Sequence, residues 1–501
     1  MSNTIVAVAI VVIALTLVSI DLTQGVVQKT FWLSIFTLVL GVGASIAVIN
    51  PLVGLIVNSL IIFYITYQGM HSYKPNIYFP FILAYMFMLL SVPVSFEALP
   101  LRLISIIIGC SYILIIQLVL NRNRFNKTIS GTRKALILNI TRQIDSMIEG
   151  NDNSTFNMER DVLINTSVKA IYDTKLKSKY ITVKNKGNLE VTLALQNIGQ
   201  ILSDFSRKDI LEKKEKNFLV EIKEALQLLD EYFYGSTEKK LITEKVNLAF
   251  KKLDLKTANK NILDLVEAIK KLPEKLVWIE NNEKKHIPQK DLAIKNALKV
   301  VDIKSAAFKF GIKLALALSI VIFVVDVFDI TYGRWIVFPM ISIIQPYYEG
   351  TGKKAIDRII GTVLGIIFFT VLFTFVEDNT VRLNIIIFLA YINLFVSKYH
   401  ISTSLVAISA LGSIAMSGGG IEILGFRILF TIIGCSIAML INKYILHYTV
   451  EDSIKDLEIE YEKEILELNG MENALQDEDT RYNLILKTKL IEYKLNQSGK
   501  S

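Results

Sequence analysis

The sequence predicts an all-α, polytopic membrane protein with two duplicated hydrophobic helical blocks. A cytoplasmic helical insert separates the blocks, and a cytoplasmic helical tail follows them. Three observations lead to this fold class. The chain of 501 residues is 52% hydrophobic although it carries 55 Lys/Arg and 47 Asp/Glu. The charges are segregated along the chain. The apolar runs between them are long enough to cross a hydrocarbon core about 30 Å thick.

The segregation of charge sets the predicted regions. Residues 1–120 hold three Lys/Arg and two Asp/Glu, and residues 306–446 hold ten and seven. Residues 121–305 hold 35 and 25, and residues 447–501 hold 7 and 13. A soluble protein would mix polar and apolar residues throughout its length. The sequence therefore predicts a first membrane block at 1–120, a helical domain at 121–305, a second block at 306–446 and an acidic helical tail at 447–501.

Eleven membrane spans are predicted, five in the first block and six in the second. They lie at 4–22, 29–49, 52–68, 77–95 and 99–120, and at 307–328, 333–346, 356–376, 382–397, 402–418 and 424–446. The segment 333–346 is short for a span and is the candidate for a half-buried one. The first run lacks a basic flank, so a cleaved signal peptide is not expected.

The orientation follows from the Lys/Arg content of the short loops. With the N-terminus outside, the inner side receives Lys29, Lys74 and the basic cluster 122–127, and the second block places most of its Lys/Arg there too. The insert and the tail then lie in the cytoplasm. The exceptions are four arginines near outer helix ends: Arg102, Arg334, Arg382 and Arg427.

An internal repeat connects the two blocks. Residues 102–111 and 427–436 both contain an arginine, six further residues and then Gly-Cys-Ser, at an offset of 325 residues. The only two cysteines of the chain, Cys110 and Cys435, coincide under this shift. The repeat predicts a parallel internal duplication. The first block is about one helix shorter, and one cysteine in each block gives no disulfide or zinc spacing.

A motif in the second block carries a family resemblance. Residues 333–352 are Gly-Arg-Trp-Ile-Val-Phe-Pro-Met-Ile-Ser-Ile-Ile-Gln-Pro-Tyr-Tyr-Glu-Gly-Thr-Gly, and Arg358-x-x-Gly361-Thr362-x-x-Gly365 follows. This pattern resembles the fusaric acid resistance (FUSC) superfamily, which includes bacterial aromatic acid exporters and is related to plant malate channels. The resemblance implies a transporter of organic anions. In the first block only 31–32 and 50–51 hint at the motif.

The motif also makes physical sense by itself. Gly361 and Gly365 lie one turn apart, which allows another helix to approach closely, and Thr362, Gly109 and Gly434 are further candidates for helix packing. The Gln345-Pro346 break interrupts helical hydrogen bonding, which a membrane tolerates only where the backbone is buried in protein or faces water.

The candidate substrate-binding residues each have a structural alternative. Arg358 could contact an anion or anchor the helix at the cytoplasmic face. Trp335 could stack on a ligand or lie in an interfacial belt, and Gln345 lies at the predicted helix break. Arg102 and Arg427 could bind an anion, pair with Glu97 or Glu422, or extend to the interface.

The insert and the tail are predicted to be helical. The insert shows three- and four-residue apolar spacing, with helices near 127–149, 157–182, 190–206, 213–234, 239–254, 258–272 and 289–305. It contains no phosphate-binding glycine-rich loop. Its basic excess is interleaved with acidic residues, as on a solvated surface beside anionic lipid, so no nucleic acid partner is expected. The acidic tail is expected to dock on this basic insert.

These observations predict a secondary transporter that exports small organic anions such as aromatic carboxylates. An anion channel shares nearly every feature, and a membrane-anchored scaffold for envelope proteins is a third interpretation. No cofactor, metal or enzymatic activity is expected, because the four histidines are scattered and form no catalytic cluster. The expected partners are the lipid bilayer and the organic anion, and the sequence allows a homo-oligomer.

Overall fold

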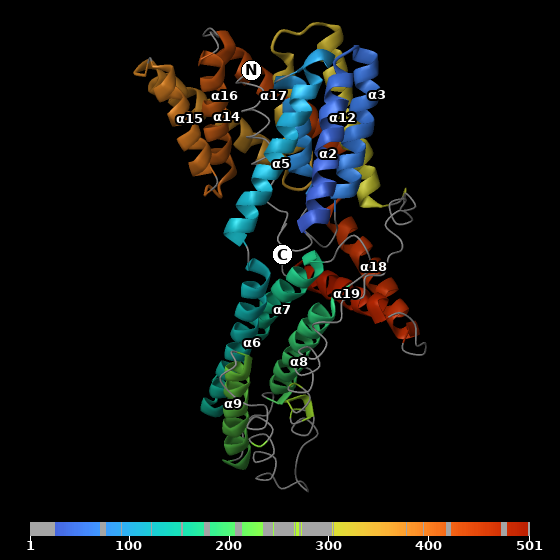
Figure 1. The fold of residues 1–501 in the computed structure, drawn as a ribbon, viewed down its shortest axis with the longest axis vertical. Coiled ribbons are helices and arrows are strands. Elements are labelled where there is room, and N and C mark those ends of the chain that lie inside the picture. Colours follow the sequence, from blue (N-terminus) through green and yellow to red (C-terminus); the bar gives the residue numbers. More distant parts are fainter. Residues whose placement is uncertain are drawn as a thin grey trace. The chain divides into compact units, whose positions relative to one another are not determined.

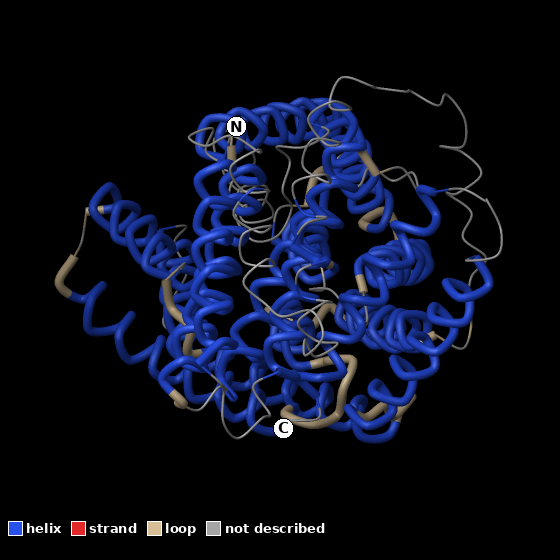
Figure 2. The backbone as a smooth tube through the Cα atoms, turned by 90° about the horizontal axis from the view of Figure 1, so that it is seen from below, coloured by secondary structure: helices blue, strands red, loops and turns tan. Residues whose placement is uncertain are grey.

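All the secondary structure in the described part of the chain is helical, as predicted (Figures 1 and 2). The structure is a computed structural model. Apart from a few single positions between 244 and 303, it describes residues 26–70, 77–91, 93–121, 123–151, 154–174, 181–205, 213–233, 305–376, 378–393, 395–416, 422–471 and 478–498. The chain divides into two compact units. The membrane unit contains residues 1–20, 30–114 and 300–456, and the helical unit contains residues 21–29, 115–299 and 457–501.

Helices occupy the predicted spans of the first block that are described. They are α2 (Val26–Ala47), α3 (Pro51–Gly69), α4 (Tyr78–Met86) with the π-helix η1 (Phe87–Ser91), and α5 (Leu99–Asn121) after the short 3-10 helix η2 (Phe96–Ala98). The start of α3 is fixed locally: the Asn50 side chain accepts a hydrogen bond from Leu52 N at 2.8 Å, and Pro51 takes the first helical position. The predicted span 4–22 lies outside the described residues.

Helices also occupy all six predicted spans of the second block. They are α12 (Ala306–Val327), η3 (Gly333–Ile336) with α13 (Val337–Ile343), α14 (Thr351–Thr374), α15 (Asn379–Asn393), α16 (Tyr399–Met416) and α17 (Glu422–Tyr444). At 1.5–2 Å per residue, η3 and α13 together rise less than 20 Å, well short of the roughly 30 Å of a hydrocarbon core. Residues 333–343 are therefore too short to cross such a core, and we call them the half-span.

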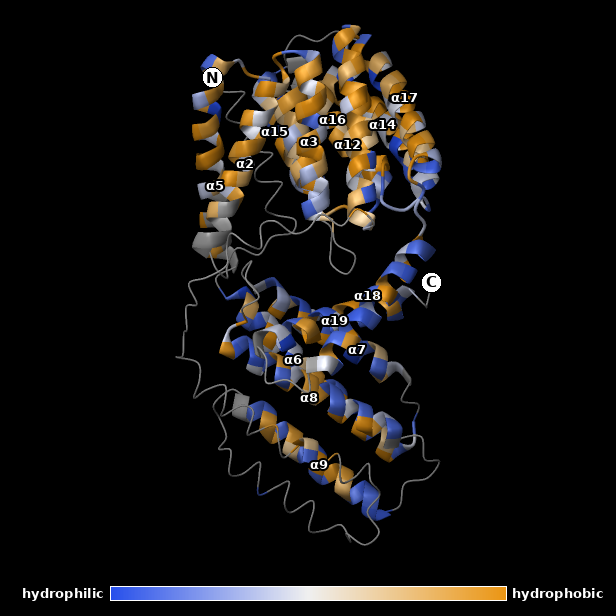
Figure 3. Ribbon diagram, turned by 90° about the vertical axis from the view of Figure 1, so that its right-hand side faces the viewer, coloured by the Kyte–Doolittle hydropathy of each residue, from blue (hydrophilic) through white to orange (hydrophobic). Residues whose placement is uncertain are grey.

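Four of the described helices are long and apolar enough to cross a membrane: Pro51–Gly69, Ala306–Val327, Thr351–Thr374 and Glu422–Tyr444. Shorter apolar helices occur at Leu33–Ala47, Tyr78–Leu90 and Gly333–Ile343. Figure 3 shows α3, α12 and α14 hydrophobic along most of their length, whereas polar and apolar residues alternate on the helices of the helical unit. The protein is therefore a multi-pass membrane protein with a separate amphipathic helical unit.

Within the membrane unit the two blocks pack through α3 and α12, which run side by side (Figure 1). Phe63 of α3 contacts Phe308 of α12, with ring centroids 5.4 Å apart and planes at 84°. A Cβ on Gly311 would lie 3.1 Å from the Phe63 ring. Edge-to-face aromatic pairs over a small residue let two helix backbones lie close together.

In the second block α14 packs against α16. A Cβ at Gly361 would overlap Thr403 Oγ1 and His400 O, and a Cβ at Gly365 would lie 2.7 Å from Ser404 O and from the Ala407 Cβ. The α14 backbone therefore lies directly on α16, with no room for a side chain at either glycine.

The helical unit is built from α6 (Arg124–Glu149), α7 (Ser154–Thr174), α8 (Val183–Phe205), α9 (Lys213–Phe233), the second part of α18 (Val450–Met471), and α19 (Glu478–Ser498). Two predicted boundaries were wrong. The helix predicted at 157–182 is described as far as Thr174 and does not include residues 181–182, and the one predicted at 190–206 begins at Val183. Thr182 caps this earlier start by accepting a hydrogen bond from Asn185 N, and the helix continues through Gly187. The helices predicted at 239–254, 258–272 and 289–305 lie almost wholly outside the described residues.

A buried polar network lies among α6, α7 and α8. Arg160 is 2% exposed, and it donates to Gln143 Oε1 at 2.5 Å and to Asn139 Oδ1 at 3.4 Å. Gln143 in turn donates to Ser203 Oγ at 2.9 Å. Burial lowers the pKa of Arg160 to about 10, partly offset by the neighbouring Asp161 carboxylate, so the guanidinium stays charged at neutral pH. The network fixes the relative positions of these three helices.

The tail helix α19 packs against α7 within the helical unit. Tyr482 donates to Glu190 Oε1 at 3.1 Å, and Lys186 lies 5.3 Å from the centroid of the Tyr482 ring. The acidic excess of the tail resides in α18, with eight Asp/Glu and two Lys, whereas α19 carries three Asp/Glu and four Lys/Arg. Lys487 of α19 pairs with Glu460 at 2.9 Å and with Glu464, both on α18. Two of the acidic residues of α18 therefore pair with α19 inside the tail, and α19 makes the contact with α7 of the insert.

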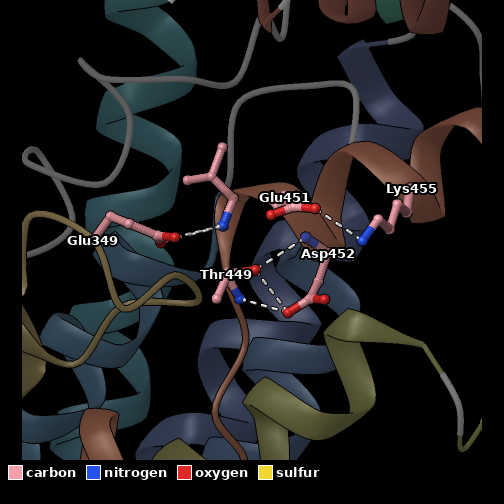
Figure 4. Close-up of polar contacts among 6 residues, drawn as sticks. Glu349, Thr449, Glu451, Asp452 and Lys455 are labelled. Atoms are coloured by element: carbon pink, nitrogen blue, oxygen red, sulfur yellow. Dashed lines mark hydrogen bonds and ion pairs between the residues drawn. The ribbon is translucent and has the colours of Figure 1, made fainter.

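The loop after α13 is fixed to the junction between α17 and α18, inside the membrane unit. The Glu349 carboxylate accepts a hydrogen bond from Val450 N at 3.1 Å (Figure 4). Thr449 Oγ1 accepts from Asp452 N, and Asp452 Oδ2 accepts from Thr449 N at 3.0 Å. This reciprocal capping box starts α18. Hydrogen bonds to the Thr449 backbone and hydroxyl hold the pKa of Asp452 below its usual value.

We predict that Gly361→Ala destabilises the membrane unit by about 1–3 kcal/mol, because its Cβ would collide with the His400 carbonyl. The matched control is Gly352→Ala on the same helix, where a Cβ meets nothing within 4 Å. The control should be neutral or stabilise the helix by up to about 1 kcal/mol. Thermal unfolding of the full chain in detergent measures both. Equal unfolding temperatures for the two variants would show that α14 and α16 are not in direct contact.

Candidate functional site

Arg427 lies inside the membrane unit, on the buried face of α17. Its side chain is 5% exposed, and its Cζ lies 3.8 Å from the centroid of the Trp335 ring. Trp335 belongs to η3 and packs on the apolar cluster of Ile366, Leu411 and Ile423. A guanidinium over an indole face is a cation–π contact, worth about 2 kcal/mol when desolvated. Trp335 therefore contacts an arginine. The sequence analysis had considered only stacking on a ligand or a place in the interfacial belt.

Arg358 is a second buried arginine of the same block. It lies on α14, is 8% exposed, and is close enough to Arg427 for the two like charges to repel. Its field also reaches Cys435 of α17, whose Sγ lies 3.9 Å from Ala355 O, one turn before Arg358. The contact between α14 and α17 thus brings two cations together in an apolar interior.

Neither arginine pairs with a carboxylate among the residues that the structure describes. The Nε atoms of Arg358 and Arg427 are both buried and make no hydrogen bond there. An isolated charge in an apolar interior costs several kcal/mol, and two like charges cost more. This arrangement can serve one chemistry well, because an anion that entered would find two guanidinium groups with free donors and an aromatic wall.

Close backbone packing holds these elements in place. A Cβ at Gly434 would lie 2.5 Å from Ile336 O, so α17 contacts the half-span directly, at the residue that follows Trp335. Asn442 is fully buried on α17 and donates to Ile343 O at 3.2 Å and to Thr351 Oγ1 at 3.1 Å. It thereby joins the end of α13 to the start of α14. Thr362 is also buried, and its Oγ1 donates back to Arg358 O at 2.9 Å.

Arg102, the repeat partner of Arg427, has a different environment. It is fully buried on α5, and its Nη1 donates to Met88 O of the π-helix η1 at 3.3 Å. Arg102 thus has a protein acceptor for its charge. Gly109 lies buried on the same helix, one residue before Cys110, which contacts Thr37 Oγ1 at 3.4 Å.

The structure adds polar residues that the sequence analysis did not select. Arg334 donates to Leu90 O of η1 at 3.4 Å and pairs with Asp326 of α12 at 3.6 Å. Arginines from both blocks therefore meet the carbonyls of one π-helix. Lys313 of α12 is 3% exposed and lies 5.7 Å from the Phe310 ring centroid. Asp326 and Lys313 could have been selected from the sequence, because charged residues are rare within predicted membrane spans.

The structure brings three of the five candidate binding residues into one region: Arg358, Arg427 and Trp335. Arg102 lies in the first block. Gln345 is half-buried in the loop after α13, and it makes no hydrogen bond to Arg358 or Arg427 in the described structure. These three residues all lie within the second block.

The fold is that of a multi-pass helical membrane protein, and its second block buries two arginines that have no carboxylate partner in the described structure. Residues 319–441 match the family described as fusaric acid resistance protein-like. This range contains Trp335, Arg358 and Arg427. The predicted family resemblance is confirmed for the second block, which is similar to the FUSC family over these residues.

Curated relatives support the same assignment. The chain is 30% identical over 150 residues to an uncharacterized protein, ORF2, of Neisseria gonorrhoeae, a match that covers 29% of this chain and 36% of the relative. It is 29% identical over 147 residues to the inner membrane protein YccS of Escherichia coli, covering 28% of this chain and 20% of YccS. The chain thus matches about a third or less of the length of these relatives. No solved structure matches the chain.

We predict that replacement of Arg427 and of Arg102 by methionine shifts stability in opposite directions. Arg427→Met removes an uncompensated buried charge and should raise the unfolding temperature, because apolar replacement of such charges is often stabilising by about 1–4 kcal/mol. Arg102→Met leaves the Met88 carbonyl without its donor, which costs about 1–3 kcal/mol. This variant should therefore have a lower unfolding temperature. Thermal unfolding in detergent measures both. A lower unfolding temperature for Arg427→Met would show that the contact with Trp335 stabilises the protein by more than the buried charge costs.

Proposed function

We propose that this protein is a secondary transporter that exports small organic anions, aromatic carboxylates among them, across the membrane. The observation that carries the proposal is the buried pair Arg358 and Arg427, with free guanidinium donors beside Trp335. The family match over residues 319–441 supports a transporter in general, and the substrate class rests on the chemistry of the pair.

The chemistry of the site suits a planar carboxylate. A guanidinium donates two parallel hydrogen bonds to the two oxygens of a carboxylate, and an ion pair formed in an apolar interior is strong. Aromatic walls are available from Trp335 and Phe369, which share the cluster around Ile366. An aromatic ring in the substrate can pack on these faces while its carboxylate meets the arginines.

The proposal includes the duplicated architecture. Shifted by 325 residues, α14, α15, α16 and α17 fall on α2, α3, α4 with η1, and α5, with ends that differ by five residues or fewer. The two cysteines make corresponding contacts, since Cys110 touches α2 and Cys435 touches α14. Under the same shift η3 and α13 fall within the predicted span 4–22. On this basis the blocks have five and six spans, and α12 is the additional helix.

We also propose that the insert and the tail lie in the cytoplasm, because the short loops place most Lys/Arg on that side. The energy source is a proton gradient or the membrane potential, a choice that rests on the lack of an ATP-binding motif in the sequence. The proposal requires no cofactor and no catalytic step.

The test measures export of radiolabelled benzoate from cells that express the full chain. Arg427→Gln and Arg358→Gln should each increase retained benzoate about tenfold or more over the native protein, since each removes a charge-assisted hydrogen bond worth about 1.5–3 kcal/mol. The matched control is Arg382→Gln, which removes a charge from the same block. Arg382 donates to Val376 O and Phe373 O at the end of α14, away from the arginine pair.

Equal benzoate retention in cells with the native chain, with the variants and without the protein would contradict the proposal for this substrate. If the protein conducts anions across a planar bilayer faster than a carrier can turn over, it is an anion channel and the same arginines line its pore. Because Arg427→Gln also relieves a buried charge, folded protein is quantified in the membrane of every strain before the rates are compared.

A further inference from the structure

Two segments of the insert are basic and contain no acidic residue. Residues 122–134 hold five Lys/Arg and no Asp/Glu, and residues 175–189 hold five Lys and no Asp/Glu. Elsewhere in the insert basic and acidic side chains alternate. The two segments are about 50 residues apart in the chain, so the sequence gives no reason to expect them together.

The structure brings the described parts of these segments to one cavity of about 390 Å³ in the helical unit. Its cationic lining residues are Lys127 and Arg133 of α6 and Lys184 of α8. The other described lining residues are Asn123, which precedes α6, Asn126, Ile129 and Ser130 of α6, and Asn188 of α8. None of the described lining residues is acidic. Three cations with several neutral donors suit an anion that carries more than one oxygen acceptor.

The helix ends reinforce this preference. The cavity extends from the start of α6, at Arg124, over its first three turns, and over the first two turns of α8, which begins at Val183. Neither helix has an acidic residue in its first turn, and the Asn123 side chain does not cap α6. The positive ends of two helix dipoles therefore add to the side-chain charges.

The chain before the cavity suggests where the anion comes from. The last two turns of α5 belong to the same unit and expose the apolar side chains of Ile115, Leu118 and Val119. Only Arg122 separates the end of α5 at Asn121 from the first lining residue, Asn123. An exposed apolar turn followed at once by a basic polar cavity fits a molecule with an acyl chain and an anionic headgroup.

We propose that this cavity binds a phosphate-bearing anion, the headgroup of an anionic phospholipid whose acyl chains lie along the end of α5. The site is separate from the arginine pair in the membrane unit and does not depend on the proposed transport function. Phosphate oxygens would accept hydrogen bonds from Lys127, Arg133 and Lys184, and the amides of Asn123, Asn126 and Asn188 would contact the polar part of the headgroup.

The test uses native mass spectrometry of the full chain in detergent, with phosphatidylglycerol or phosphatidylcholine of identical acyl chains added. The native chain should retain at least fivefold more phosphatidylglycerol than phosphatidylcholine. The double variant Lys127→Gln/Lys184→Gln should lose at least fivefold of that retention. The matched control is Lys134→Gln/Lys214→Gln, which removes two exposed charges of the same unit outside the cavity and should stay within twofold of the native chain.

Equal retention of the two lipids by the native chain would overturn the proposal. The proposal would also be overturned if the control variant lost as much phosphatidylglycerol retention as the double variant, because binding would then depend on diffuse surface charge. A third arm adds soluble glycerol 3-phosphate at millimolar concentration and measures the unfolding temperature. Suppose that glycerol 3-phosphate stabilises the native chain but not the double variant, and that the native chain retains both lipids equally. This result would rule out a phospholipid as the ligand and would show that the cavity binds a soluble phosphate. Circular dichroism of each variant confirms that the helical unit is folded.

Discussion

A guanidinium ion in an apolar interior needs carboxylates, carbonyl oxygens, an aromatic face or a mobile anion, because water is not available to solvate it. This constraint organises the membrane unit. Arg102 meets the Met88 carbonyl of the π-helix, and Arg334 meets Leu90 O of the same π-helix. Arg427 meets the face of Trp335 and makes no hydrogen bond to a carbonyl oxygen in the described structure. The same residue type at corresponding positions of the repeat thus has two different environments.

This difference separates a structural arginine from a candidate functional one. In the first block η1 continues α4 and turns carbonyl oxygens toward Arg102. In the second block α16 remains a regular α-helix, and the half-span η3–α13 places Trp335 on the arginine. Without a carbonyl acceptor, Arg427 has hydrogen-bonding capacity that the proposed anionic substrate would use. The neighbouring Arg358 increases the cost of burying the Arg427 charge.

The glycines make this arrangement possible. Gly361 and Gly365 let α14 lie on α16, and Gly434 lets α17 contact the half-span. A side chain at any of these positions would push the helices apart and move Arg358 or Arg427 relative to Trp335. The helical unit uses polar contacts for the same purpose, with Arg160 joining α6 and α7 and with Tyr482 tying the tail to α8.

The sequence by itself determined the helical class, the placement of ten described helices at predicted spans and the family of the second block, because hydropathy and the motif of residues 333–365 are local properties. It also selected Arg427, Arg358 and Trp335 individually. Only the tertiary structure distinguished Arg102 from Arg427, placed Trp335 on a guanidinium, and joined residues 123–133 to residues 184–188 around one cavity. These features depend on which side chains meet across helices far apart in the chain. The hydropathy of a helix does not specify which other helix it packs against. That choice depends on where small residues let two helix backbones come close together.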